Sequence, residues 1–160
     1  VGSAGRQQTR AGAGVTALPE WAADLGLQRH PEGGWYAETW RSDFSVDMPD
    51  YPTSRALGTA IYFLLMHGEE SAWHRVRSAE LWFHHQGSPL QLSLGGDGDV
   101  PSDPVRHRLG SRVSDGELPQ LLIPPGHWQA ARLLGDEPVL VSCVVVPGFD
   151  FADFEMHGPA

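Results

Sequence analysis

Residues 68–87, GEESAWHRVRSAELWFHHQG, carry the most informative pattern of the chain. Gly68 and Gly87 bound two strand-like runs that a turn connects. The first run contains His74, and the second contains Glu80, six residues further on. Side chains of a strand alternate between the two faces of its sheet, so this His and this Glu can meet when both face a cavity. The stretch therefore predicts an antiparallel hairpin with a polar pair on one face.

The composition indicates one turn-rich domain. The chain has 160 residues, 41% of them hydrophobic, with 19 glycines and 13 prolines; such a chain can bury a substantial core and favours many short strands. Its net charge of −9 comes without a basic stripe, so we expect neither a nucleic-acid partner nor a membrane partner. The one cysteine, Cys143, lies in an apolar run and allows no internal disulfide, which favours a cytoplasmic location.

Patterns on both sides of the hairpin predict further strands. Residues 1–17 are rich in glycine and alanine without periodicity, so we expect a flexible tail before one domain at 18–160. Pro19 and Gly26 are placed to begin and end a short helix. Eight or nine short strands without βαβ alternation indicate an all-β sandwich or jelly-roll barrel. The segments that carry these patterns are 35–41, 59–65, 90–94, 105–109, 120–123, 127–132 and 139–146.

The segment WYAETWR at 35–41 mixes aromatic and charged residues. Strict alternation places Tyr36 and Glu38 on one face and Arg41 on the other. Neither face is apolar, which suits a pocket or a subunit interface. The C-terminal segment PGFDFADFEM is aromatic and acidic, and we expect its phenylalanines, Phe149 among them, to cover one end of the barrel.

The hairpin resembles the first motif of the cupin superfamily, Gly-x5-His-x-His-x3/4-Glu-x6-Gly. Gly68, His74, Glu80 and Gly87 stand at the spacing of that motif, and Val76 occupies the position of its second His. The match in spacing is specific, whereas the match in metal ligands is partial.

The later segment PPGHWQ at 124–129 resembles the second cupin motif, Pro-x-Gly-x2-His-x3-Asn. Gln129 occupies the position of the third metal-binding His, and Leu133 that of the Asn. From about Leu18 onward, the segments HPEGGWYAETWRS, AIYFLL, PPGHWQAA and PGFDFADFE resemble the Cupin_5 family of small stand-alone cupins. This resemblance implies a cupin-type double-stranded β-helix, that is, a jelly-roll barrel.

Members of that family are described as similar to seed-storage proteins and to sugar-nucleotide epimerases of the dTDP-4-dehydrorhamnose 3,5-epimerase type, which use a His base and a Tyr acid. The leading hypothesis is therefore an isomerase or epimerase acting on a carbohydrate or sugar-nucleotide-like carbonyl compound. His74 would be the base and Glu80 its orienting partner. Tyr36 or Tyr62 would supply the acid. This hypothesis requires no cofactor.

Two alternatives remain open. The protein can be a cupin that binds a small ligand without turnover, with the His–Glu pair merely holding the hairpin together. It can also be a metal-dependent cupin, such as an oxygenase, in which His74, Glu80 and Gln129 hold a divalent metal and His84 substitutes for a missing ligand. A free sheet edge further predicts a homodimer. The candidate contacts to a small-molecule ligand are Gln129, Trp82, His84, Trp128, Glu38 and Phe149.

Overall fold

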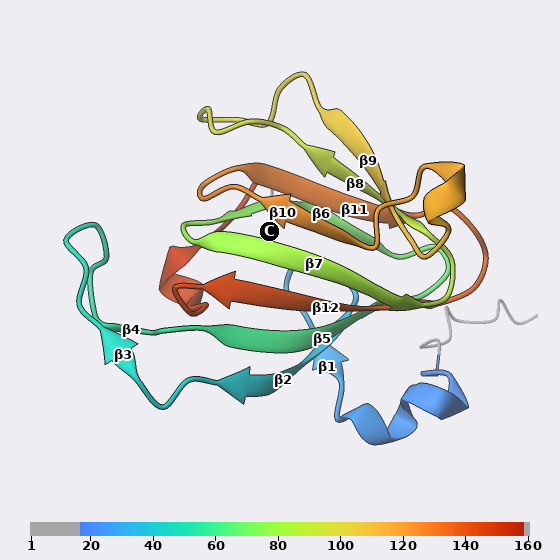
Figure 1. Cartoon of the computed structure of the whole chain (residues 1–160), viewed down its shortest axis with the longest axis horizontal. Coiled ribbons are helices and arrows are strands. Elements are labelled where there is room, and N and C mark those ends of the chain that lie inside the picture. The colour runs from blue at the N-terminus through green and yellow to red at the C-terminus, as the bar shows by residue number, and fades with distance from the viewer. Residues whose placement is uncertain (1–16, 159–160) are drawn as a thin grey trace, which may run out of the picture.

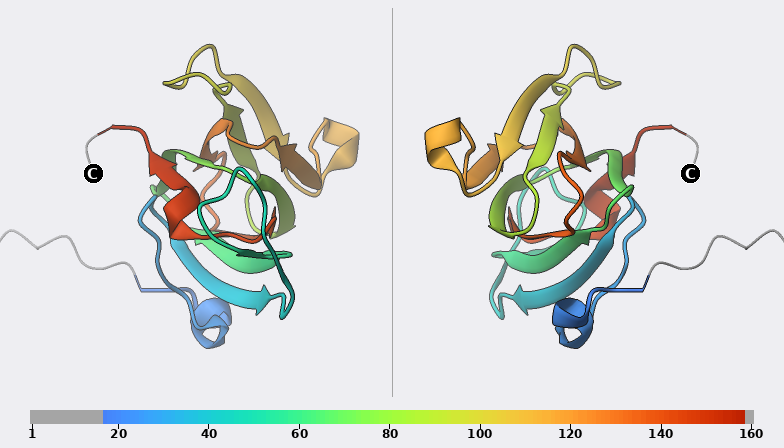
Figure 2. Two further views of the ribbon diagram at one scale, coloured as in Figure 1. Left: turned by 90° about the vertical axis from the view of Figure 1, so that its left-hand side faces the viewer. Right: turned by 90° about the vertical axis from the view of Figure 1, so that its right-hand side faces the viewer.

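Two antiparallel sheets face each other and form a jelly-roll barrel in the computed structural model, which describes residues 17–158 (Figure 1). The larger sheet contains, in spatial order, β1 (Gln28–Arg29), β2 (Trp35–Arg41), β5 (Thr59–Leu65), β12 (Val139–Val146), β7 (Ala79–Gln86) and β10 (Gln120–Ile123). The smaller sheet contains β13 (Phe154–Met156), β6 (Glu70–Val76), β11 (Trp128–Leu133), β8 (Leu90–Leu94) and β9 (Val105–Leu109). Viewed from its ends, the molecule shows the sheets curving around a common interior, with the C-terminal segment beside them (Figure 2).

The all-β barrel predicted from the strand patterns is confirmed. The antiparallel hairpin predicted at 68–87 is wrong, because its two strands lie in different sheets: β6 pairs with β11 and β13, whereas β7 pairs with β12 and β10. The expected flexible tail lies, apart from residue 17, outside the described residues. Within 17–158, no helix is long and apolar enough to cross a membrane.

The predicted N-terminal helix is a short 3-10 turn, η1 (Glu20–Leu25), and two further 3-10 turns follow, η2 (Val113–Asp115) and η3 (Phe151–Asp153). Gly26 ends η1 in the left-handed conformation, at φ 67°. Six residues between Pro19 and this glycine leave little room for i→i+4 hydrogen bonds, which explains the tighter turn. The polar loop expected after β2 also contains a small ribbon of β3 (Ser45–Val46) and β4 (Arg55–Ala56).

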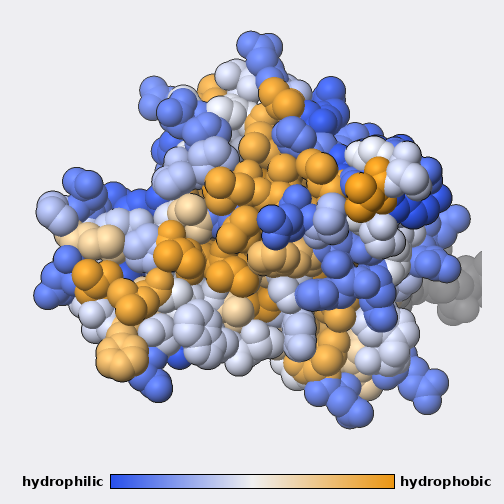
Figure 3. All heavy atoms as spheres, viewed as in Figure 1, coloured by the Kyte–Doolittle hydropathy of each residue, from blue (hydrophilic) through white to orange (hydrophobic). Residues whose placement is uncertain are grey.

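The core lies between the two sheets. Its largest fully buried members include Trp82, Phe63 and Leu92. A second, smaller cluster packs η1 onto the outer face of the larger sheet through Ala22 and Leu64. On the surface, apolar atoms gather over the centre of the face drawn in Figure 3, where β7 and β10 lie in Figure 1.

A β-bulge corrects the predicted faces of β2. The pairing of β2 with β5 shifts between Glu38 and Trp40, so one extra residue, Thr39, stands in the strand. An extra residue reverses the direction of every side chain that follows it. Arg41 therefore lies on the same side as Glu38, and the expected separation of the two charges is wrong.

Candidate active site

A cavity of about 360 Å³ lies inside the barrel. This volume falls at the lower end of ligand pockets and suits a small molecule. The polar part of its wall is formed by Glu32, His74, Glu80, His30 and Tyr36. Its aromatic part contains Phe63, Trp82, Phe149, Phe151 and Phe154.

His74 lies deep in this cavity and is held at both ring nitrogens. Its Nδ1 lies 2.8 Å from the backbone oxygen of Ala72, and its Nε2 lies 3.2 Å from Oε2 of Glu32. A carbonyl only accepts, so Nδ1 carries the proton and donates it to Ala72. In the neutral ring, the lone pair is then on Nε2 and points at the Glu32 carboxyl group.

Glu32 reaches this position through the loop HPEGG at 30–34. Its Oε1 accepts a hydrogen bond from the Ser71 hydroxyl at 2.9 Å, and its backbone N–H donates to Nδ1 of His30. Gly33 adopts φ 108°, and a Cβ there would stand 2.2 Å from the backbone oxygen of Glu70. Only glycine allows the loop to lie this close to β6 and so bring Glu32 beside His74.

Burial controls the protonation of this group of residues. Desolvation raises the pKa of Glu32 to about 8, although the Ser71 hydrogen bond opposes the shift. Desolvation, followed by the charge of His74, lowers the pKa of His30 to about 4. Burial also lowers the pKa of His74, against the attraction of Glu80. At neutral pH Glu32 is therefore mainly protonated, and its hydroxyl can donate to Nε2 of the neutral His74.

Glu80 does not pair directly with His74. Its Oε2 accepts a hydrogen bond from Nε2 of Gln129 at 2.5 Å, and Oε1 of Gln129 accepts the indole N–H of Trp82 at 3.0 Å. Burial raises the pKa of Glu80, while the nearby His74 and the Gln129 hydrogen bond oppose that rise. Cys143 lies against Glu80, and burial raises the pKa of its thiol well above the usual range, so this thiol stays protonated.

The predicted metal ligands do not fit a metal ion in this arrangement. An indole N–H only donates, so the Gln129 amide must turn its oxygen to Trp82 and its NH2 toward Glu80. The amide then offers no lone pair to a metal beside His74 and Glu80. Val76, at the motif's second His position, is apolar and lines the same cavity. Within residues 17–158, no group of three or more His, Cys, Asp or Glu side chains is arranged to hold a metal ion.

The mouth of the cavity is charged. Glu38 and Arg41 form a two-armed ion pair, with Nε to Oε1 at 3.1 Å and Nη2 to Oε2 at 2.7 Å. Nη2 of Arg41 also donates to the backbone oxygen of Phe149. The pair thus connects β2 to the C-terminal segment that forms one wall of the mouth.

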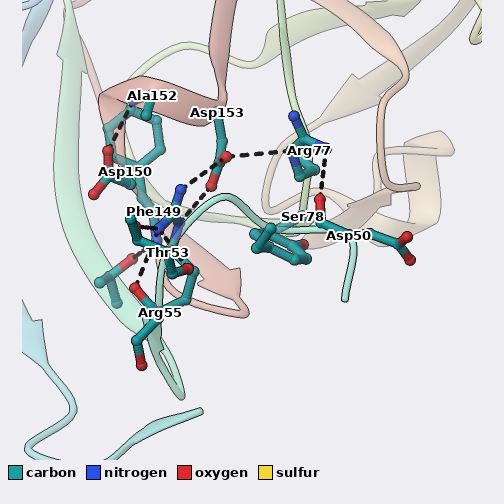
Figure 4. A network of polar contacts seen from close by, with 12 residues as sticks. Asp50, Thr53, Arg55, Arg77, Ser78, Phe149, Asp150, Ala152 and Asp153 are labelled. Carbon is teal, nitrogen blue, oxygen red and sulfur yellow. Dashed lines mark hydrogen bonds and ion pairs between the residues drawn. The ribbon is translucent and has the colours of Figure 1, made fainter. Parts of the chain in front are cut away.

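A buried ion pair holds that C-terminal segment in place (Figure 4). Arg55 of β4 donates to both carboxylate oxygens of Asp153, at 2.7 and 3.0 Å, and the two side chains are 2% and 1% exposed. Arg77 donates to the same carboxylate and to the backbone oxygen of Asp50. The contact therefore joins the β3–β4 ribbon, the turn after β6 and η3 at one point.

Two of the predicted ligand contacts, His84 and Trp128, lie outside the cavity. His84 is half-buried and its Nε2 lies 3.3 Å from the backbone oxygen of Ser88. Trp128 is buried in the smaller sheet, donates to the backbone oxygen of Gly98 and has Arg75 over its ring. Trp82, Glu38, Phe149 and Tyr36 line the cavity, whereas Gln129 stands behind Glu80.

Sequence reasoning missed Glu32 as the carboxyl group closest to His74. The sequence contains part of the information needed to find Glu32, because Pro31, Gly33 and Gly34 around it indicate a loop with special backbone angles. The sequence analysis predicts that the C-terminal phenylalanines cover one end of the barrel. It does not predict that Phe151 and Phe154 form part of the cavity wall.

Comparisons with known proteins agree with this fold. The model of the Cupin_5 family, described as "Cupin superfamily (DUF985)", matches residues 19–157. A hypothetical protein from Leishmania major is 37% identical, with a TM-score of 0.76, and 84% of each chain is covered. A protein from Shewanella oneidensis is 36% identical, with a TM-score of 0.77, over 86% of this chain and 82% of that one. An uncharacterized protein from Saccharomyces cerevisiae is 29% identical over 153 residues, which cover 86% of this chain and 74% of that protein.

More distant structures share the fold alone. A dTDP sugar isomerase from Desulfovibrio desulfuricans is 16% identical, with a TM-score of 0.54, over 83% of this chain and 84% of that one. An oxalate decarboxylase from Bacillus subtilis is 17% identical, with a TM-score of 0.55, over 85% of this chain and 32% of that one.

Proposed function

Because the chain belongs to the Cupin_5 family of the cupin superfamily, we propose that its barrel cavity is the active site of an isomerase or epimerase acting on a small carbonyl compound of carbohydrate size. The observation that carries this proposal is the buried pair of His74 and Glu32. The hydrogen bond from Nδ1 to Ala72 fixes the tautomer of the ring, so Nε2 and the Glu32 carboxyl group share one mobile proton at the cavity wall.

In the deprotonated form of this pair, His74 accepts a proton from the substrate carbon next to the carbonyl group. The C–H electrons pass into an enolate. A proton returned to that carbon from the opposite face completes an epimerisation. In an isomerisation the proton is instead added to the former carbonyl carbon, while the proton of the neighbouring hydroxyl group moves to the former carbonyl oxygen. Tyr36 lies on β2, in the opposite sheet from His74 on β6, and its ring packs against His30 with centroids 4.7 Å apart. In this proposal its phenol returns the proton from the other side.

Glu80 assists through its charge rather than as the direct partner of His74. Its carboxyl group lines the cavity, and its attraction favours the protonated ring of His74 that forms during the reaction. The fold likeness to a dTDP sugar isomerase supports the reaction class only at the level of fold.

The experiment is proton exchange in D2O, followed by NMR over a panel of aldoses, ketoses and small 2-hydroxy carbonyl compounds. We expect at least one panel member to lose its α-proton signal, at a rate that rises with pH toward about 8 as Glu32 loses its proton. His74→Gln should slow the exchange about 100-fold or more, whereas Tyr36→Phe should leave exchange at His74 and slow the inversion by a similar factor. His84→Gln, outside the cavity, is the matched control and should leave the rate unchanged.

One observation favours binding without turnover as a second candidate. Both ring nitrogens of His74 already have protein partners, which also describes a purely structural histidine. A panel member that raises the melting temperature equally in the wild type and in His74→Gln, with no exchange in either, would establish the binding function and end the enzymatic proposal.

A further inference from the structure

The wall of the cavity carries an excess of acidic groups. Within the described part of the chain, four carboxyl groups line it, from Glu32, Glu38, Glu80 and Asp150, against a single arginine, Arg41. Asp150 uses one oxygen to accept the backbone N–H of Ala152 at 2.8 Å. Its other oxygen has no hydrogen-bond partner among residues 17–158. Glu32 is mainly protonated at neutral pH and Glu38 is paired with Arg41, so the negative potential of the cavity comes from Asp150 and from the ionised forms of Glu80 and Glu32.

The one arginine is not free to bind an anion. Its guanidinium group is held by both oxygens of Glu38 and by the backbone oxygen of Phe149. The sequence contains no lysine, so no ammonium side chain can reach the cavity from anywhere in the chain. Among residues 17–158, the cavity offers a phosphate or pyrophosphate group no unpaired arginine or lysine side chain.

The remaining wall is aromatic. Phe149, Phe151 and Phe154 form a set of edge-to-face contacts, with ring centroids 4.9 to 6.1 Å apart, and His30 stacks on Phe151 at 6.0 Å. Aromatic faces together with carboxylates attract organic cations through cation–π and charge interactions. The same rings would also pack against the apolar face of a sugar.

We infer that the ligand of this cavity is a small organic cation, an amine or alkylammonium compound, and not a nucleotide-linked or phosphorylated sugar. The carboxyl groups at the mouth and floor bind the positive charge, and the aromatic wall encloses it. This inference rests on the proposed function in placing the ligand in the same cavity; the proposed substrate then becomes an aminated carbonyl compound, such as an amino sugar. Binding itself requires no turnover, so the two proposals can fail separately.

Binding of a cation is coupled to proton release. Glu32 and Glu80 are buried, and desolvation raises the pKa of both carboxyl groups. A bound cation would favour their ionised forms, so affinity should rise with pH. The other titratable or charged groups facing the cavity are His30 from the loop, and Tyr36, Glu38 and Arg41 from β2. His74 from β6, Cys143 from β12 and Asp150 from the C-terminal segment complete the set.

Two matched ligand pairs test the inference by calorimetry on the full chain. Choline is compared with its neutral isostere 3,3-dimethylbutan-1-ol, and glucosamine with glucose. We expect the cation of at least one pair to bind about tenfold tighter than its neutral partner. Its affinity should increase between pH 6 and pH 8. Equal affinity within both pairs, no cation binding at millimolar concentration, or tighter binding of thymidine diphosphate would each overturn the inference.

Charge-removing variants locate the site. Asp150→Asn keeps the acceptor oxygen for Ala152 and removes one charge, so it should weaken cation binding about threefold without affecting a neutral ligand. Asp115→Asn, on the exposed turn η2, is the control with the same change of charge. His74→Gln should retain cation binding even though it abolishes proton exchange. Exchange of a neutral sugar that depends on His74, with no preference for cations, would leave the proposed function standing and end this inference alone.

Discussion

The side-chain oxygen of Gln129 accepts the indole N–H of Trp82 at 3.0 Å, and both side chains are 1% exposed. This contact orients the amide and so presents its NH2 group to Glu80. One glutamine therefore satisfies a buried donor on one side and a buried carboxyl group on the other. In the cupin motif this position is occupied by a metal-binding His. Here Gln129 of β11 forms hydrogen bonds to Trp82 and Glu80 of β7 and so connects the two sheets.

Gln129→Met should lower the free energy of unfolding by about 2–4 kcal/mol. The methionine fills a similar volume but leaves the Trp82 N–H and the Glu80 carboxyl group buried without a partner, and each such loss costs about 1–3 kcal/mol. Urea unfolding measures the change. Gln86→Met on the exposed end of β7 is the control and should change stability by less than about 0.5 kcal/mol.

Restoring the two missing ligands should create a metal site. In the double variant Val76→His/Gln129→His, imidazoles join His74 and Glu80 at the spacing of the cupin metal motif. We expect this variant to bind Zn²⁺ or Ni²⁺ near one equivalent by elemental analysis, and more tightly than the wild type in a calorimetric titration. The single variant Val76→His is the control, since the Gln129 amide still faces Trp82. Equal, tight binding by wild type and double variant would contradict our assignment of the amide.

The strands of the barrel follow from local patterns, whereas the contacts of the site do not. The bounds of β5 and β12 are predictable because each is an apolar run limited by turn residues. The meeting of His74 with Glu32 depends on a contact between residues 42 positions apart, brought about by a glycine loop pressed against β6. The sequence pattern at 68–87 favours Glu80 as the partner of His74, because alternation describes only which residues of one strand share a face. It gives no information about contacts with a distant loop.

The bulge in β2 shows the same limit. Nothing in WYAETWR distinguishes a regular strand from one with an extra residue at Thr39, because a bulge appears only when two strands are paired. Alternation without the bulge predicts that Arg41 faces away from Glu38. With the extra residue, Arg41 lies beside Glu38 at the mouth of the cavity. The charge of the cavity could therefore not be calculated from alternation.

The homodimer expected from the sequence stays a prediction. The edge of β2 is the surface on which we expect the two copies to pair. β1 pairs only with Trp35 and Tyr36, so the rest of β2 presents an edge that is unpaired within residues 17–158. Trp40 on this edge is 52% exposed. We expect a dimer by light scattering, and Trp40→Glu should shift it toward monomer. Trp21→Glu, 45% exposed on η1, is the matched control; a monomeric wild type would refute the prediction.

The ion pair between Arg55 and Asp153 should contribute strongly to stability. Asp153→Asn leaves a buried guanidinium group without its counter-charge, which costs about 3–5 kcal/mol for a buried pair. Because Asp153 belongs to the segment that forms the mouth, hydrogen exchange in residues 149–156 should also become faster. The exposed pair of Arg75 and Glu155 provides the control, and Glu155→Gln should cost less than about 1 kcal/mol. Similar losses in both variants would show that burial does not strengthen the Arg55 contact.

The raised pKa of Glu32 predicts that stability falls as pH rises. The folded state holds the Glu32 proton up to about pH 8, whereas the unfolded chain releases it near the ordinary pKa of 4.5. The folded state thus binds more protons in this window, and the contribution of Glu32 to the free energy of unfolding decreases with pH until it is lost above about pH 8. The raised pKa of Glu80 acts in the same direction, whereas the lowered pKa values of His30 and His74 act in the opposite direction until the unfolded chain has lost its histidine protons around pH 6.5. Between pH 6.5 and pH 8 the decrease from Glu32 alone should be about 1.5 kcal/mol.

Glu32→Gln isolates this effect. Its amide oxygen can still accept from Ser71 and its NH2 can donate to Nε2 of His74, so it imitates the protonated carboxyl group. We expect the variant to have nearly wild-type stability at pH 6.5 and to lose most of the pH dependence between pH 6.5 and pH 8, measured by urea unfolding at both values. Glu20→Gln on the exposed turn η1 should retain the wild-type slope. A variant Glu32→Gln that keeps the full slope would show that Glu32 is already ionised at neutral pH, and the shared proton assigned to His74 and Glu32 would then be wrong.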